Sequence, residues 1–256
     1  MNYASTGYHL EKSIFCSEVK IVREKINSVF RLYTKDYKTD FDSLVVQLFK
    51  SDFDGFFGCA NVCQNLPELY NLCFHAEMML LLKKLGIANV CMNTRPLISF
   101  SSKLTAKNDN YWRVPAHQDW PSTLGSLNGL TCWIPLVDLY DKDLGPLEIS
   151  ESSHLLGNLQ SEDHGVPILT SEINLDFKPI FMGIGDILFF NNFVVHKSGD
   201  NVTDKIRLTL HFRYDDYSES TYIDRKFPRY RQDVRKPFVQ NDNFPTIEQI
   251  KNALGL

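Results

Sequence analysis

The chain has 256 residues, of which 43% are apolar and 12% aromatic, and these values are typical of a folded protein with a sizeable core. The formal net charge is −4, which gives no support for nucleic-acid binding, because proteins that bind nucleic acids usually carry a basic surface. The N-terminus has no basic segment followed by an apolar one, and no run approaches the roughly 18 apolar residues that cross a bilayer, so we expect a cytoplasmic protein with no membrane partner.

The first predicted elements are helices. In residues 17–34 apolar side chains recur every three or four positions, which gives one apolar stripe, and Ser17 is placed to cap that helix. The segment 61–86 repeats the pattern, and Gly86 suits a helix C-terminus. The two stripes are Val19, Val22, Ile26, Val29 and Tyr33, and then Leu69, Leu72, Cys73, Ala76, Met79, Leu80 and Leu82. We therefore predict a helical N-terminal layer over about residues 1–90.

After residue 90 the pattern changes to short β-branched and aromatic runs separated by turn residues, which is typical of strands. Because no helical segment lies between them, these runs favour an antiparallel sandwich or barrel over a parallel α/β sheet. The predicted strands are residues 129–138, 145–150, 178–182, 185–190, 193–196 and 207–214. We predict a single domain, 1–256, with a β core over about 91–215 and a C-terminal extension over about 216–256.

The six cysteines show no Cys-x-x-Cys pair, and most of them lie in apolar, helix-like sequence. We interpret them as reduced core thiols rather than disulfide or metal ligands. Cys59 and Cys63 are a weak candidate for a metal pair, because no second pair accompanies them.

The segment 224–236, DRKFPRYRQDVRK, is the most basic part of the chain. Its cations are Arg225, Lys226, Arg229, Arg231, Arg235 and Lys236. A solvated basic face is the favoured interpretation, and contact with an anionic substrate or a phosphate is the alternative.

The stretch WRVPAHQDW, residues 112–120, places His117 and Asp119 two positions apart. A His-x-Asp pair is expected by chance about once in two chains of this composition, so the spacing alone has little weight. His75 and Glu77 have the same spacing but fall in a predicted helix, where residues two apart point in different directions. His117 and Asp119 fall where a strand is expected to end, and alternate residues of a strand point the same way.

A third ligand is needed for a strong metal site, and the stretch GDILFFNNFVVHKSGDN supplies His196 at the end of an apolar run. Two imidazoles and one carboxylate on a β scaffold form the facial arrangement that suits non-haem Fe(II) and leaves positions open for chemistry. His117, Asp119 and His196 are therefore our candidate metal ligands.

Eleven residues after His196, Arg207 opens a strand with one polar and one apolar face. The polar face carries Arg207, Thr209, His211 and Arg213, and the other carries Leu208, Leu210, Phe212 and Tyr214. A polar face on a core strand is explained if it lines a cavity that holds a carboxylate, which a guanidinium binds through two hydrogen bonds. The alternative is a polar face that meets water.

These motifs together resemble the phytanoyl-CoA dioxygenase-like group of Fe(II)- and 2-oxoglutarate-dependent dioxygenases. The similarity runs from GYHLEKSIFCSEVKIVREKI through HQDW, CWIPLVDL, GPLEISESSH and GDILFFNNFVVHKSGDN to RLTLHF. It implies a double-stranded β-helix, or jelly roll, packed against N-terminal helices. It also implies that His117, Asp119 and His196 bind iron and that Arg207 pairs with the far carboxylate of 2-oxoglutarate.

The resemblance implies further contacts to the cosubstrate from Ser198, Trp133 and Thr209, while Gln118 stays unassigned and His154 is expected to be structural. The implied reaction uses O2 and hydroxylates an aliphatic C–H bond of a small, polar molecule, with release of succinate and CO2. His211 and Arg213 are candidate substrate contacts. The alternatives are a catalytically silent jelly-roll binding protein and a cupin-like metal-dependent isomerase, neither of which depends on 2-oxoglutarate. The sequence leaves the oligomeric state open.

Overall fold

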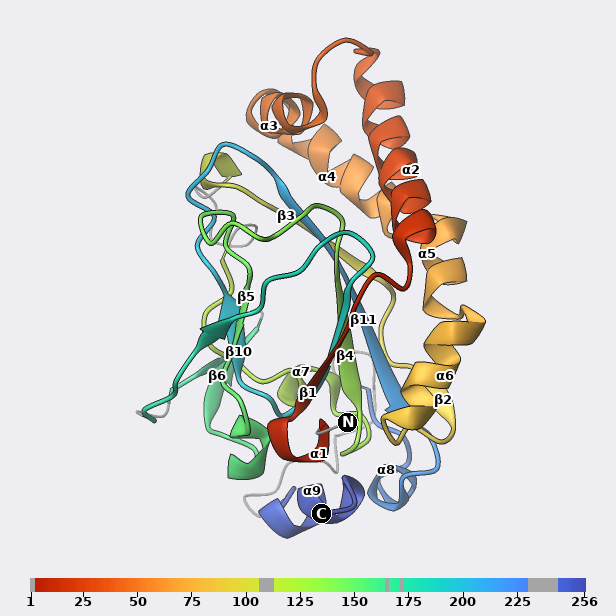
Figure 1. Cartoon of the computed structure of the whole chain (residues 1–256), viewed down its shortest axis with the longest axis vertical. Coiled ribbons are helices and arrows are strands. Elements are labelled where there is room, and N and C mark those ends of the chain that lie inside the picture. Colours follow the sequence, from red (N-terminus) through yellow and green to blue (C-terminus); the bar gives the residue numbers. More distant parts are fainter. Residues whose placement is uncertain (1–2, 106–112, 164–165, 171–172, 230–243) are drawn as a thin grey trace.

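The computed structural model describes residues 3–105, 113–163, 166–170, 173–229 and 244–256. Helices cover one face of a mainly antiparallel sheet, a smaller sheet lies against the other face, and the two ends of the chain lie near each other (Figure 1). None of the helices in the described part is long and apolar enough to cross a membrane.

The helical layer follows a short helix α1 (Tyr3–Thr6) and the strand β1 (Tyr8–Glu11), which joins the large sheet. Its helices are α2 (Cys16–Thr34), α3 (Phe41–Ser51), α4 (Phe53–Cys63), α5 (Pro67–Cys73) and α6 (Ala76–Lys84). These helices fall within residues 1–90, where the sequence predicts a helical layer, and β1 is a strand in the same stretch.

The predicted helix over 17–34 is confirmed as α2, but its predicted cap is wrong. Phe15 occupies the N-cap position, and the Ser17 hydroxyl donates to the Glu18 carboxylate instead of capping the backbone. The buried stripe ends at Phe30, while Tyr33 is 52% exposed and donates its hydroxyl to Asp52. A stripe at 3.6 residues per turn drifts around the helix, which is why its last predicted member faces solvent.

The second predicted helix, over 61–86, is divided into three elements. Pro67 has no N–H group and therefore begins a new helix at its first position, and the His75 side chain accepts from the Glu77 N–H at the start of α6. His75 thus precedes the helix rather than lying in it. Gly86 has φ +95 just beyond α6, which confirms that it suits the helix end.

The large sheet has the strand order β1-β9-β4-β11-β2, and β3 also pairs with β11. A smaller sheet has the order β10-β5-β8, and β6 pairs with β7. The strands after β1 are β2 (Val90–Met92), β3 (Leu97–Ser101), β4 (Leu130–Pro135), β5 (Leu147–Ile149), β6 (Ser161–Asp163), β7 (Pro167–Leu169), β8 (Lys178–Pro179), β9 (Ile187–Asn191), β10 (His196–Ser198) and β11 (Arg207–Asp216). All pairings are antiparallel, as predicted.

One predicted strand, 193–196, is wrong. Residues 192–195 form a turn in which the Phe193 N–H donates to the Asn191 side chain and the Val194 N–H donates to the Asn191 carbonyl. His196 therefore begins the strand β10 instead of ending one. The apolar run is explained by burial of this turn, in which Phe193, Val194 and Val195 are fully buried.

The large sheet is buried on both faces. Leu208, Leu210, Phe212 and Tyr214 of β11 join the core beneath the helices, together with Leu130, Cys132 and Ile134 of β4. The opposite face of β4 and β9 contributes Trp133, Leu188 and Phe190 to a second apolar cluster, which includes Leu147 and Ile149 of the smaller sheet. The polar side of β11 therefore faces the space between the two sheets rather than bulk water.

All six cysteines are free, and the predicted core position holds for the four that are buried, Cys59, Cys63, Cys73 and Cys132, but not for the partly exposed Cys16 and Cys91. The predicted solvated basic face is wrong for Arg225, which is 8% exposed and donates to the carbonyls of Leu124 and Gly125. Arg231, Arg235 and Lys236 lie outside the described residues.

The C-terminal extension contributes α8 (Ser220–Asp224) and α9 (Ile247–Ala253). Ile250 of α9 packs in an apolar cluster with Trp120 of the helix α7 (Trp120–Thr123) and with Phe193 of the turn before β10. The extension thus supports the two segments that lie directly beside Asp119 and His196.

A buried carboxylate near the end of β11 predicts a pH-dependent stability. Asp215 accepts from the Ser126 N–H and hydroxyl and from the Asn93 side chain, and burial raises its pKa to about 6. A raised carboxyl pKa means that folding favours the protonated form, so its contribution is present at low pH and is lost as the pH rises through 6. The total loss is ~3 kcal/mol, about half of it between pH 5 and 8.

We therefore expect wild-type protein to lose stability relative to Asp215→Asn between pH 5 and pH 8, measured by urea unfolding at each pH. Asp138→Asn is the control, since Asp138 is exposed and also accepts from a backbone N–H, that of Ile184. An equal pH dependence of wild type and Asp215→Asn would show that Asp215 titrates normally.

Candidate metal centre

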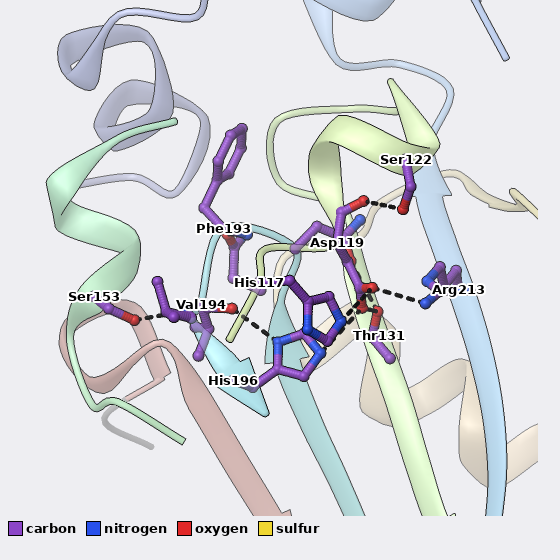
Figure 2. Close-up of polar contacts among 12 residues, drawn as sticks. His117, Asp119, Ser122, Thr131, Ser153, Phe193, Val194, His196 and Arg213 are labelled. Carbon is purple, nitrogen blue, oxygen red and sulfur yellow. Dashed lines mark hydrogen bonds and ion pairs between the residues drawn. The ribbon is translucent and has the colours of Figure 1, made fainter. Parts of the chain in front are cut away.

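His117, Asp119 and His196 meet between the two sheets. Their potential ligand atoms all lie within 4.8 Å of one another, and within the described residues they form the one such group of three metal-ligating side chains. The two imidazole rings lie 4.1 Å apart between centroids, and each histidine Nε2 is 3.8 Å from one oxygen of Asp119 (Figure 2). All three residues are at most 6% exposed. The structure thus brings together the three residues that the sequence predicts to share a site, and their role as metal ligands stays a prediction.

The local structure that joins the pair differs from the predicted strand end. The backbones of His117 and His196 exchange two N–H···O hydrogen bonds of 3.0 Å as an isolated antiparallel bridge, which brings their side chains together. Asp119 has helical backbone angles and precedes α7, so strand alternation is not what aligns it with His117. The predicted residues therefore converge, but the strand-end geometry predicted for them is wrong.

Hydrogen bonds fix the orientation of each imidazole. Nδ1 of His117 lies 2.8 Å from the Pro115 carbonyl, and Nδ1 of His196 lies 3.0 Å from the Val194 carbonyl. A carbonyl only accepts, so Nδ1 carries the proton and donates in both rings, which leaves the Nε2 lone pairs directed toward Asp119. This is the tautomer that a metal ligand needs.

Asp119 is held by two donors. The Thr131 hydroxyl of β4 donates to one carboxylate oxygen at 2.6 Å, and Arg213 of β11 donates to the other at 2.7 Å (Figure 2). Burial opposes ionisation of Asp119, but the charge of Arg213 and its hydrogen bond to the carboxylate hold the pKa of Asp119 below the ordinary range. Asp119 is therefore a carboxylate at neutral pH.

Burial also lowers the pKa of both histidines, and that of His117 falls to about 3, with the neighbouring His196 as the second cause. Both rings are thus neutral, with free lone pairs. Two neutral imidazoles and one ionised carboxylate, all buried and convergent, are the donor set that fits Fe(II).

Arg207 lies at the far end of the same face of β11. It is 5% exposed, and its guanidinium donates to the carbonyls of Gly145 and Gly199, while its Nε has no hydrogen-bond partner in the structure. Burial lowers its pKa to about 10, so the guanidinium is still charged at neutral pH. A buried cation with an unused donor fits a bound carboxylate, because that anion would supply both the charge and the missing acceptor.

The remaining predicted residues lie along the same inter-sheet space. The Thr209 hydroxyl and His211 Nε2 are 3.2 Å apart, and the His211 ring lies edge-on to Trp133 with centroids 6.2 Å apart. Ser198 follows His196 on β10. Burial lowers the pKa of His211 to about 3, so this ring is neutral. The cosubstrate roles of Ser198, Thr209 and Trp133, and a substrate role for His211, stay predictions.

Gln118 and His154, which have no predicted site role, make hydrogen bonds within the fold. Gln118 is fully buried, donates to the carbonyls of Gly157 and Phe193, and accepts from the Leu159 N–H, so it bridges loops behind the centre. His154, expected to be structural, contacts the Ala4 carbonyl through Nε2 at 2.9 Å.

Sequence reasoning missed the two side chains that hold Asp119. Thr131 is one of several hydroxyl residues in the predicted strands, and its role depends on strand register, because it lies opposite Arg213 across the β4–β11 pair. Arg213 is a predicted substrate contact, and the structure pairs it with the candidate metal ligand Asp119. No spacing in the sequence marks either contact, since Arg213 and Asp119 are 94 positions apart.

Comparison with known proteins finds a matching family model and two related proteins. The family model described as phytanoyl-CoA dioxygenase (PhyH) matches residues 43–209. A methylphosphonate hydroxylase from Gimesia maris is 31% identical over 175 residues, which cover 68% of this chain and 65% of that protein. A 2-aminoethylphosphonate dioxygenase from Uncultured bacterium HF130_AEPn_1 is 24% identical over 175 residues, which cover 65% of this chain and 64% of that protein. The chain thus matches about 65% of the length of these relatives.

Among solved structures, the epimerase SnoN in complex with Fe3+, alpha-ketoglutarate and nogalamycin RO has a TM-score of 0.60. It is 18% identical and the match covers 85% of this chain and 82% of that protein. Similarity at this level establishes the fold, and it confirms the predicted jelly-roll architecture.

Proposed function

Because this chain belongs to the phytanoyl-CoA dioxygenase (PhyH) family, we propose that it is a non-haem Fe(II)- and 2-oxoglutarate-dependent dioxygenase that hydroxylates an aliphatic C–H bond of a small phosphonate. The observation that carries the proposal is the buried convergence of two neutral imidazoles and one carboxylate. The phosphonate class is supported by the two relatives, which are named for methylphosphonate and 2-aminoethylphosphonate.

Each group in the site has a distinct task in this proposal. His117, Asp119 and His196 hold iron, which supplies O2 activation coupled to conversion of 2-oxoglutarate to succinate and CO2. Arg207 binds the far carboxylate of 2-oxoglutarate. Further contacts to this cosubstrate come from Ser198, Thr209 and Trp133. The protein then contributes orientation, since a C–H bond reacts only when it is held next to the metal.

Burial of the site supports this assignment. The face of β11 that carries Arg207, Thr209 and Arg213 is enclosed between two sheets, and charge pairing is stronger in such an environment than in water. An enclosed centre also keeps water away from the reacting groups. The cytoplasmic location stays a prediction from the sequence.

The test is turnover of methylphosphonate and 2-aminoethylphosphonate by protein supplied with Fe(II), 2-oxoglutarate and O2. We expect a hydroxylated phosphonate, followed by 31P NMR, in equal amount to succinate, and no product without 2-oxoglutarate. Acetate is the matched non-phosphonate control. Succinate release that neither phosphonate stimulates would show that the substrate class is wrong, and product without 2-oxoglutarate would contradict the proposed reaction.

A further inference from the structure

Arg213 has donors that the contact with Asp119 does not use. One terminal nitrogen donates to Asp119, while its Nε is buried and has no hydrogen-bond partner in the structure. A guanidinium offers five N–H donors in a fixed plane, and a buried donor without an acceptor is costly. The Arg213 side chain is 15% exposed, so part of it is open to a ligand.

The two arginines of this face lie at opposite ends of it. Arg207 and Arg213 are six residues apart on one extended strand, which separates their Cα atoms by roughly 20 Å. Arg207 contacts the carbonyls of Gly145 and Gly199, whereas Arg213 contacts the metal ligand Asp119. An anion on Arg213 therefore does not compete with a carboxylate on Arg207.

The arrangement around Asp119 places such an anion beside the metal centre. Arg213 approaches Asp119 from the side opposite to the two histidines (Figure 2). The Asp119 carboxylate thus faces the two histidines on one side and accepts from Arg213 on the other, at 2.7 Å. A phosphonate has its carbon bonded directly to phosphorus, so few bonds separate its C–H groups from the anionic oxygens that Arg213 would bind.

The charges of the site favour an anion as well. The two charges of Fe(II) are matched by the two carboxylates of 2-oxoglutarate, and Asp119 matches one of the two arginines. One positive charge is left over in a buried space, and a neutral substrate would leave it uncompensated.

We propose that Arg213 is a specificity-determining residue that binds the anionic oxygens of a phosphonate or phosphate-like group while it holds Asp119. The inference rests on the proposed function, because it assumes the iron and 2-oxoglutarate complex. Arg213 thereby links recognition of the anionic group to the position of a metal ligand. A purely structural role would require only the contact with Asp119.

The experiment is a binding titration without turnover. Anaerobic protein is saturated with Fe(II) and 2-oxoglutarate, and the change in its visible charge-transfer band is followed on addition of methylphosphonate, of inorganic phosphate, and of the uncharged dimethyl methylphosphonate. The variants are Arg213→Gln and Arg213→Lys. Arg23→Gln, which removes an exposed arginine of α2, is the control for loss of one charge.

Wild type and Arg23→Gln should bind methylphosphonate at least tenfold more tightly than its dimethyl ester. Arg213→Gln should lose this preference and bind methylphosphonate at least tenfold more weakly, while Arg213→Lys, which keeps charge but not the planar donors, should lie between them. A wild-type dissociation constant in Arg213→Gln at saturating iron would overturn the inference. If Arg213→Gln forms no charge-transfer band, the test rests on Arg213→Lys. Unchanged methylphosphonate binding in Arg213→Lys then overturns the inference.

Failure of the proposed reaction has a different signature. Arg213-dependent binding of methylphosphonate or phosphate without a hydroxylated product would refute the substrate and leave the anion site established. Turnover of methylphosphonate with the same binding constant in wild type and Arg213→Gln would refute the anion site and leave the reaction established. No anion binding in wild type would refute the inference.

Discussion

His117→Ala protein should lose the charge-transfer band that Fe(II) and 2-oxoglutarate form anaerobically, and its turnover should fall by about 10³-fold or more. The reason is that removing one of three protein ligands leaves a bidentate site, and loss of even an outer partner typically costs ~10–100-fold in metal affinity or activity. Visible absorption measures the band, and iron content after desalting measures binding directly.

His9→Ala is the matched control for this variant, because His9 and Glu11 have the same His-x-carboxylate spacing as His117 and Asp119. Their side chains lie 2.8 Å apart on β1, but among the residues that the structure describes no third metal-ligating side chain joins them. His9→Ala should keep both the band and the iron. A folded His117→Ala protein with wild-type iron content would refute the assigned metal centre.

Arg207→Ala should require about 10²-fold more 2-oxoglutarate to reach half of the charge-transfer band. The Arg207 guanidinium is buried, and hydrogen bonds to charged groups contribute ~1.5–3 kcal/mol, which corresponds to about one to two orders of magnitude in affinity. The band itself should persist at saturating cosubstrate, because the iron ligands are intact. The titration therefore separates loss of 2-oxoglutarate binding from loss of metal.

Arg207→Lys should fall between wild type and Arg207→Ala, since lysine keeps the charge but lacks the planar pair of donors. Thermal unfolding must accompany the titration, because Arg207 also donates to the carbonyls of Gly145 and Gly199. Unchanged half-saturation in a stable Arg207→Ala protein would mean that 2-oxoglutarate binds elsewhere.

Several features of the centre were determined by the sequence alone. The alternation of β11 predicted which side chains line the inter-sheet face, because in a strand successive residues point to opposite sides regardless of the rest of the fold. The order His117, Asp119, His196 and Arg207 identified the family, which the match over residues 43–209 confirms. The free cysteines were also predictable, since their spacing and apolar surroundings are local properties.

Other features depend on contacts between distant segments. Asp119 lies at the start of a short helix and His196 at the start of a strand, so the local patterns around them misplaced both relative to their elements. The two histidine side chains converge because a backbone bridge joins His117 and His196. The pairing of Arg213 with Asp119 follows from the β4–β11 register, which sets Thr131 opposite Arg213.

The sequence by itself thus determined the strand alternation and the family and selected the candidate metal ligands, because these are carried by residue type and short-range spacing. Only the tertiary structure decided that α9 packs against Trp120 and that Arg213 holds Asp119. The physical reason is that register and packing join segments roughly a hundred residues apart, and no local pattern encodes which of several polar side chains will meet there.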